Sequence, residues 1–261
     1  MRVEPHVREA GRGRPVVLLH AFPVNASMWL GQREGLSAVC RVVTPDQRGF
    51  GGTQLGHDDP SLDEVADDIA AMLDSRKISG KIVLGGLSMG GYVAMAFWRR
   101  HRERVSALIL ADTKSTADTA EGAANRERVA TSVLEAGNSK QLAEDMLPKL
   151  LGSTTLEKRP LVLGRVRALV ETAPPYAVAW AQRAMAKRPD STPDMAAVDV
   201  PTLVVVGEED ALTPPSDSEA LAATVPGARL VKIPAAGHLC AVEAPEAFND
   251  AVSEFLGALP E

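Results

Sequence analysis

The sequence has few aromatic residues and no excess of basic residues. Aromatic residues make up 4% of its 261 positions, and 28 lysines and arginines face 34 acidic residues, for a formal net charge of −6. A nucleic-acid-binding protein would carry a basic face, so this balance disfavours a nucleic-acid partner. With 45% hydrophobic and 24% charged residues, the composition is that of an ordinary globular protein, which excludes fibrous and disordered classes.

Long apolar runs and paired cysteines are also absent. No run reaches the ~18–20 apolar residues of a membrane span, and residues 1–14 carry charges where a signal peptide would have an apolar segment. Cys40 and Cys240 lack the Cys-x-x-Cys spacing of redox or zinc pairs, so free thiols in a reducing compartment are expected. We expect a cytoplasmic protein with no membrane partner, no metal site and no cofactor.

Short apolar runs alternate with amphipathic segments along the chain. Predicted strands are Val16–Leu19, Cys40–Thr44, Ile82–Leu84, Val105–Leu110, Thr202–Val206 and Arg229–Ile233. Three of them are continuous β-branched or leucine-rich runs, which is typical of strands buried on both faces. Helices are predicted after the capping box at 61–64, over 89–100 and over 245–256. The alternation predicts an α/β fold, a mostly parallel central sheet flanked by helices.

One region interrupts this alternation. Residues 114–195 show helical spacing of apolar residues, several prolines and no convincing strand. A structureless loop of that length is implausible in a compact domain. We therefore predict a core of residues 1–113 and 196–261 and a helical cap inserted at 114–195, placed to fold over the strand ends as a lid.

The segment around Ser88 carries the strongest chemical signal. Gly86-x-Ser88-x-Gly90 stands directly after a predicted strand and directly before a predicted helix. That context is typical of a nucleophile elbow, in which the serine occupies a strained turn and small residues flank it. The helix start directs its amides at developing negative charge, so the Met89 N–H is expected in an oxyanion hole. The alternative is a glycine-rich turn in which Ser88 only caps the helix; the strand-to-helix context favours the nucleophile.

A serine hydroxyl needs a base to act as a nucleophile. Among the five histidines, His238 follows a predicted strand and precedes the last helix, which suits a loop at the sheet edge. His6, His57 and His101 lie in terminal, polar or charged segments typical of solvated surface. We predict that His238 is the base.

The base in turn needs an acid that fixes its tautomer. Asp210 stands just past the apolar run at 203–206, and the chain order Ser88, Asp210, His238 is that of α/β-hydrolases. Asp112, at the end of the neighbouring strand, is the rival acid, and Glu208 and Glu209 are weaker ones.

Five motifs in order resemble the α/β-hydrolase superfamily over nearly the whole chain. They are His20-Ala21-Phe22-Pro23, Asp46-Gln47-Arg48-Gly49-Phe50-Gly51, the Ser88 elbow, Gly207-x-x-Asp210 and Gly237-His238. The chain is most similar to small bacterial carboxylesterases and 3-oxoadipate enol-lactonases, and more distantly to cofactor-independent haloperoxidases. The resemblance implies that the backbone N–H of Phe22 is the second donor of the oxyanion hole. Ala21 departs from the family, which commonly has glycine there, and alanine tolerates unusual backbone angles less well.

The segment 46–52 has a second interpretation, a phosphate-binding loop. It lacks both the G-x-G-x-x-G order and a Walker lysine, so we predict a structural turn there and no dinucleotide site.

A serine–histidine–aspartate triad with an oxyanion hole predicts acyl transfer through an acyl-enzyme. The leading hypothesis is hydrolysis of a small carboxylic ester or lactone, and a serine nucleophile argues against dehalogenases and epoxide hydrolases, which use aspartate. The same triad can pass the acyl group to peroxide or to an alcohol, so perhydrolase (haloperoxidase-like) and acyltransferase activities are alternatives. A non-catalytic ligand-binding protein that retains the triad is a third.

The substrate pocket is the least constrained part of the site. Val24, Trp29, Tyr176 and Trp180 are predicted as its apolar wall together with Met89, although Trp29 and Trp180 fit core packing equally well. An enol-lactonase would also need a cation for a substrate carboxylate, and the cap offers seven arginines: Arg126, Arg128, Arg159, Arg165, Arg167, Arg183 and Arg188. No sequence feature indicates an oligomeric state.

Overall fold

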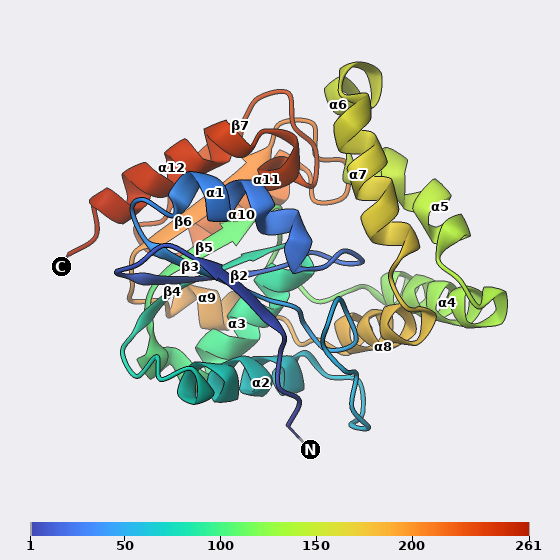
Figure 1. Cartoon of the computed structure of the whole chain (residues 1–261), viewed down its shortest axis with the longest axis horizontal. Coiled ribbons are helices and arrows are strands. Elements are labelled where there is room, and N and C mark those ends of the chain that lie inside the picture. The colour runs from blue at the N-terminus through green and yellow to red at the C-terminus, as the bar shows by residue number, and fades with distance from the viewer. Residues whose placement is uncertain (1, 261) are drawn as a thin grey trace.

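The computed structural model describes residues 2–260, and in that range the strands form one seven-stranded sheet (Figure 1). Its order is β1-β3-β2-β4-β5-β6-β7. The strands are β1 (Val7–Ala10), β2 (Pro15–Leu19), β3 (Arg41–Pro45), β4 (Ile82–Leu87), β5 (Val105–Ala111), β6 (Thr202–Gly207) and β7 (Arg229–Ile233). Neighbouring strands from β3 to β7 pair in parallel, and β1 pairs antiparallel with β3. The predicted mostly parallel sheet is confirmed.

The strand β1 lies outside the sequence prediction. Its sequence, Val-Arg-Glu-Ala, carries two adjacent charges, and the strand is half-buried at the sheet edge. Short, charged edge strands lack the apolar runs by which buried strands are recognised. The central strands β4 and β6, in contrast, are buried at every position.

Helices cover both faces of the sheet. The core helices are α1 (Leu30–Leu36), α2 (Leu62–Ser75), α3 (Met89–His101), α10 (Pro215–Thr224), α11 (Cys240–Glu243) and α12 (Pro245–Gly257). In Figure 1, α1 and α12 lie on one side of the sheet and α2 and α3 on the other. As the capping box predicted, α2 begins behind Ser61, whose side chain accepts a hydrogen bond from the Asp63 N–H.

Between β5 and β6 the chain is helical, as the apolar spacing predicted. The helices are α4 (Ala120–Ala136), α5 (Lys140–Leu150), α6 (Ser153–Lys158), α7 (Pro160–Glu171), α8 (Pro175–Ala186) and α9 (Thr192–Ala196). Helices α4 to α8 lie beside the sheet, on the right of Figure 1. The short α9 packs instead against α3 and α10. Proline begins α7 and α8, and Gly137 ends α4 in the left-handed conformation.

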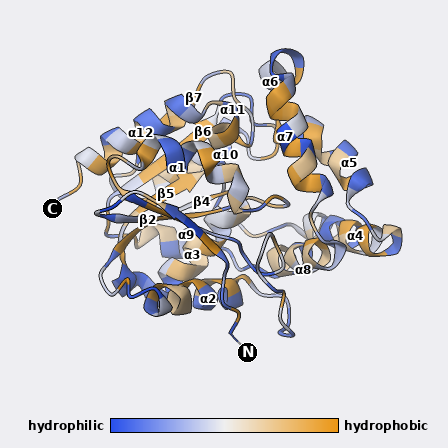
Figure 2. Cartoon of the chain, in the orientation of Figure 1, coloured by the Kyte–Doolittle hydropathy of each residue, from blue (hydrophilic) through white to orange (hydrophobic). Residues whose placement is uncertain are grey.

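The apolar residues gather where the layers meet. Figure 2 shows the inner strands as mainly hydrophobic, and the helices as hydrophobic on some faces and hydrophilic on others. One connected cluster of buried apolar side chains runs from the sheet into α4, α5, α7 and α8. Within residues 2–260, no helix is both long and apolar enough to cross a membrane.

Candidate active site

The turn between β4 and α3 holds Ser88 in an unusual conformation. Its φ of 55° and ψ of −113° lie outside the regions that non-glycine residues favour. The Ser88 N–H donates to the Ala111 carbonyl at 2.9 Å, and the Thr113 hydroxyl donates to the Ser88 carbonyl at 3.0 Å. The neighbouring end of β5 therefore braces the strained turn from the side.

The two glycines of the motif allow this close approach. A Cβ on Gly86 would lie 2.0 Å from the Gly90 carbonyl oxygen, and a Cβ on Gly90 would lie 2.1 Å from the Leu19 carbonyl oxygen. Both contacts are with backbone atoms, which cannot rotate away as a side chain can. The pattern Gly86-x-Ser88-x-Gly90 is thus required by backbone packing around Ser88.

His238 and Asp210 face each other across the loops that follow β7 and β6. The distance from His238 Nδ1 to Asp210 Oδ2 is 2.9 Å, and both side chains are buried. The Thr213 hydroxyl donates to Asp210 Oδ2 at 2.7 Å and lies 3.2 Å from His238 Nδ1. With Nδ1 engaged in this way, Nε2 is the ring nitrogen left for a proton transfer.

The Asp210 carboxylate is held in its ionised form. Oδ1 accepts the backbone N–H of Leu212 at 2.8 Å and that of Thr213 at 3.0 Å. Burial raises the pKa of Asp210, but the positive charge and hydrogen bond of His238, together with the Thr213 donors, outweigh burial and keep the pKa below its usual value. A carboxylate in this state can orient the imidazole and stabilise its protonated form.

Asp112, the rival acid, is also buried but has other partners. Its Oδ1 accepts the Gly207 N–H at 2.8 Å, and its carboxyl group also interacts with the Cys240 thiol. Burial and the nearby charge of Asp210 raise the pKa of Asp112 well above its ordinary value. The structure therefore pairs His238 with Asp210, while Asp112 lies next to that pair with other partners and a raised pKa.

The loop after β2 presents the backbone of Phe22. Within the described part of the chain, the N–H groups of Phe22 and Met89 have no protein acceptor. Ala21 is not among the residues with positive φ, so alanine fits this loop without the backbone angles that would demand glycine. The Phe22 ring packs edge-on against Phe50, with 6.4 Å between ring centroids.

The His20 ring lies behind this loop and is fully buried. Nδ1 lies 2.9 Å from the Ala21 carbonyl and Nε2 accepts the Gln47 N–H at 2.9 Å, so the neutral ring with its proton on Nδ1 satisfies both bonds. The Gln47 side chain donates in return to the His20 carbonyl at 2.7 Å. Burial, the largest influence, lowers the pKa of His20 to about 4.

Ser88 and His238 line one cavity of about 620 Å³. Phe22, Thr213 and Leu212 line it from the core, and residues of α4, α5 and α8 line it from the other side. The volume falls in the range of small-molecule sites. Many of the cap residues in the lining are polar or charged.

The four pocket residues predicted from the sequence do not line this cavity. Val24 and Trp29 are fully buried, and Trp29 packs against Phe248. Tyr176 is 56% exposed, and the Trp180 indole donates to the Asp58 carbonyl at 3.0 Å. The prediction was wrong because these aromatic rings pack into the core, face solvent or bridge α8 to a core loop.

The cap arginines divide by environment. Arg126 and Arg128 line the cavity. The other five do not line it and contact these protein groups: Arg159 (Ala235 carbonyl), Arg165 (Ser27 carbonyl), Arg167 (Glu144), Arg183 (Glu127) and Arg188 (Asp118).

Thr213 and Lys114 are site residues that the sequence prediction missed. Thr213 follows Asp210 by three residues, a spacing at which a threonine N–H can bond back to an aspartate side chain. Lys114 comes two residues after Asp112 at the end of β5, and carboxyl ends of parallel strands meet at one edge of a sheet. Thr213 thus carried a signal in its spacing from Asp210, and Lys114 in its distance from a strand end.

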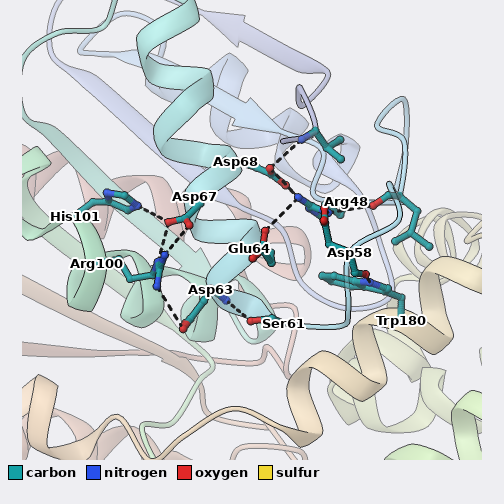
Figure 3. Close-up of polar contacts among 12 residues, drawn as sticks. Arg48, Asp58, Ser61, Asp63, Glu64, Asp67, Asp68, Arg100, His101 and Trp180 are labelled. Atoms are coloured by element: carbon teal, nitrogen blue, oxygen red, sulfur yellow. Dashed lines mark hydrogen bonds and ion pairs between the residues drawn. The ribbon is translucent and has the colours of Figure 1, made fainter. Parts of the chain in front are cut away.

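The motif around Arg48 has a structural role instead (Figure 3). The buried Arg48 guanidinium bonds to both oxygens of Asp68 on α2 and to Asp58 Oδ2 at 2.7 Å. The Asp58 carbonyl accepts the Trp180 indole of α8. This cluster joins the loop after β3 to α2 and to α8, consistent with the predicted structural turn. Across residues 2–260, no group of three or more His, Cys, Asp or Glu side chains is arranged to hold a metal ion.

Comparison with known proteins shows the family to which the chain belongs. The chain belongs to the alpha/beta hydrolase family, which residues 16–251 match. A solved structure of a thermophilic esterase from Thermogutta terrifontis, with malate bound, is 44% identical with a TM-score of 0.96 and covers 98% of this chain and 94% of its own. The enol-lactonase from Burkholderia xenovorans is 28% identical with a TM-score of 0.90, covering 98% and 97%.

A curated relative by sequence is a pimeloyl-[acyl-carrier protein] methyl ester esterase from Aeromonas hydrophila. It is 27% identical, and the match covers 96% of this chain and 98% of that protein. The chain is thus an alpha/beta hydrolase with esterase-type and lactonase-type neighbours.

Proposed function

We propose that the protein is a serine hydrolase that cleaves a small carboxylic ester or lactone through an acyl-enzyme. The observation that carries the proposal is the 2.9 Å contact between His238 Nδ1 and Asp210 Oδ2, on loops that share one cavity with Ser88. The names of the esterase and enol-lactonase neighbours support the same substrate class.

In this mechanism, Ser88 Oγ attacks the substrate carbonyl while His238 Nε2 takes the hydroxyl proton. The N–H groups of Phe22 and Met89 donate to the oxygen that becomes negative in the tetrahedral intermediate. His238 then gives its proton to the leaving alcohol, and a water molecule, deprotonated by the same ring, hydrolyses the acyl-enzyme. Asp210 remains ionised throughout and stabilises the imidazolium.

We further propose that residues 114–195 act as a cap over the acyl-enzyme. Support comes from the cavity, which is lined on one side by loops of the core and on the other by α4, α5 and α8. A covered site restricts water and strengthens electrostatic interactions with the reacting group.

Labelling with a fluorophosphonate probe tests the nucleophile, and turnover of p-nitrophenyl acetate tests catalysis. The wild-type chain is expected to take up the probe and hydrolyse the ester. Ser88→Ala should lose labelling and retain only the modest rate that the oxyanion hole supports. Ser216→Ala, which removes an exposed hydroxyl on α10, is the matched control. Unchanged turnover in purified Ser88→Ala would contradict the proposal.

A panel of acyl esters and γ-lactones then separates esterase from lactonase activity. Labelling of Ser88 with negligible turnover across the whole panel would indicate a ligand-binding protein on this fold. Rapid peracid formation from acetate and peroxide, with slow ester hydrolysis, would indicate a perhydrolase.

A further inference from the structure

The wall of the active-site cavity carries the opposite charge to the rest of the protein. Its charged residues, apart from His238, are four cations and two anions: Lys114, Arg126, Arg128, Lys149, Asp118 and Asp145. The chain as a whole has a formal net charge of −6. A positive cavity in an acidic protein concentrates anions at that site.

Asp118 does little to offset the positive charge of the cavity wall, because its carboxylate is shared by two arginines. Arg126 forms an ion pair with Asp118, and Arg188 Nη2 lies 2.8 Å from Asp118 Oδ1. Burial raises the pKa of Asp118, but these arginines outweigh it and lower the pKa, so the carboxylate is ionised. The Arg188 guanidinium is buried 4.1 Å from the centroid of the Tyr92 ring, which itself lines the cavity. Arg126, which lines the cavity, and Arg188, which does not, thus share the one negative charge of Asp118.

Lys114 adds a cation close to the nucleophile. It is half-buried, lines the cavity, and has no ion-pair partner within residues 2–260. It directly follows Thr113, whose hydroxyl donates to the Ser88 carbonyl at 3.0 Å. The segment that carries Lys114 therefore touches the turn that holds Ser88.

An ammonium group that is partly removed from water and has no carboxylate partner is stabilised when an anionic ligand binds to it. Arg128 and Lys149 are exposed and contribute to long-range attraction more than to a fixed contact. Arg126 is half-buried but paired with Asp118, whereas Lys114 is half-buried and has no ion-pair partner within residues 2–260. A single ammonium balances a single negative charge. A carboxylate meets that requirement.

We propose that the substrate of this site is an ester or lactone that also carries a carboxylate, which Lys114 binds beside Ser88. This inference rests on the proposed hydrolase function and adds the substrate class to it. The carboxylate is present in both the ground state and the transition state, so its contact with Lys114 lowers KM more than it changes kcat.

Matched ester pairs test the inference on the wild-type enzyme. Monomethyl glutarate is compared with methyl 4-carbamoylbutanoate, in which a neutral amide replaces the carboxylate. A second pair, 3-acetoxypropanoate and its amide, places the charge on the alcohol side of the ester. Acid release measured by pH-stat gives kcat and KM for each. At least one pair should favour the carboxylate by about 10- to 100-fold in kcat/KM, mostly through KM, and the preference should weaken with added salt.

Variants then assign the preference to Lys114. In Lys114→Met the ratio of the two kcat/KM values should fall towards 1. In Lys114→Arg, which keeps the charge, most of the preference for the carboxylate ester should remain. Lys140→Met removes an exposed lysine of the same cap that does not line the cavity, so its ratio should match that of the wild type.

The outcomes separate this inference from the proposed function. If the wild type hydrolyses neither member of a pair and no ester of the earlier panel, the hydrolase proposal fails. If it hydrolyses the amide esters as well as or better than both carboxylate esters, the hydrolase proposal stands and the carboxylate inference is wrong. A carboxylate preference that persists unchanged in folded Lys114→Met also overturns the role given to Lys114.

Discussion

The Glu243 carboxylate accepts the backbone N–H of Gly152 at 2.8 Å and that of Gly237 at 2.9 Å. Gly152 is the N-cap residue of α6, and Gly237 directly precedes His238. One buried carboxylate therefore fixes the start of a cap helix to the loop that carries the proposed base. A third donor, the Leu239 N–H at 3.2 Å, closes the loop around His238 from its other side.

Replacement of Glu243 by glutamine should loosen this junction. Glutamine keeps one acceptor oxygen but presents an amide group to a backbone N–H that needs an acceptor. We expect Glu243→Gln to lose about 1–3 kcal/mol of unfolding free energy, the usual result of leaving a buried donor unsatisfied, and to lower kcat. Urea unfolding and ester kinetics measure the two effects. Glu246→Gln, at an exposed position of α12, is the control, and equal behaviour of the two variants would contradict the prediction.

The two buried aspartates near His238 should respond differently to the same substitution. Asp210→Asn removes the carboxylate bonded to His238 Nδ1 and should lower kcat about 10³- to 10⁴-fold, because the imidazole loses both its orientation and the charge that stabilises it. Asp112→Asn changes a carboxyl group that bonds the Gly207 N–H, which an asparagine oxygen can also accept, and should lower kcat less than about tenfold. A larger loss in Asp112→Asn than in Asp210→Asn would reverse the assignment of the acid.

Asp112→Asn should also change the pH dependence of stability. The raised pKa of Asp112 means that the folded protein keeps a proton that the unfolded chain releases above the ordinary value of 3.8. The contribution of Asp112 to the unfolding free energy is therefore fully present below pH 3.8, and it is lost as the pH rises towards the folded-state pKa. The difference in unfolding free energy, Asp112→Asn minus wild type, should increase as the pH rises above 3.8. A pH-independent difference from urea unfolding would contradict this.

The buried parts of the fold were predictable because their sequence carries strong periodic signals. Residues 202–206 form a continuous apolar run, and the strand there is buried at every position. The edge strand at 7–10 has no such signal, since Arg8 and Glu9 interrupt its apolar residues and form ion pairs with Asp46 and Arg41. The strained turn at Ser88 was predictable for a different reason, because few sequences other than Gly-x-Ser-x-Gly fit between a strand and a helix that pass so closely.

The cavity wall was not predictable from local patterns. Tryptophan is a residue type common in ligand pockets, but the indole N–H of Trp180 donates to the Asp58 carbonyl. The face of α8 that meets the core depends on how several helices of residues 114–195 pack together. Local sequence patterns do not reveal that packing. Lysine is a residue type common on protein surfaces. Lys114 lies in the cavity wall only because β5 ends beside Ser88.

The buried Arg48 cluster should contribute strongly to stability. Arg48→Met removes the cation that both oxygens of Asp68 bond and leaves that buried carboxylate without its main partner. We expect a loss of about 3–5 kcal/mol of unfolding free energy. The same change at Arg41, whose ion pair with Glu9 is partly exposed to solvent, should cost less than about 1 kcal/mol. Urea unfolding of both variants measures the difference, and similar losses would contradict the structural role of Arg48.

The neutral His20 ring should make the protein sensitive to acid. Its pKa is about 4 in the folded protein against 6.5 for an ordinary histidine, so the unfolded chain binds a proton more readily. Stability from this group is complete above pH 6.5 and is lost as pH falls through about 4. The difference between these two pKa values corresponds to about 3 kcal/mol of unfolding free energy. Protonation would also leave the Gln47 N–H without its acceptor and disturb the loop that carries Phe22.

The variant His20→Gln isolates this effect, because a glutamine oxygen can still accept the Gln47 N–H but does not titrate. The variant should be less stable than wild type at pH 7, and its unfolding free energy should fall less steeply between pH 6.5 and 4. His57→Gln removes an exposed histidine and should retain the wild-type slope. Parallel slopes for all three proteins in urea unfolding across this pH range would show that His20 does not carry the acid sensitivity.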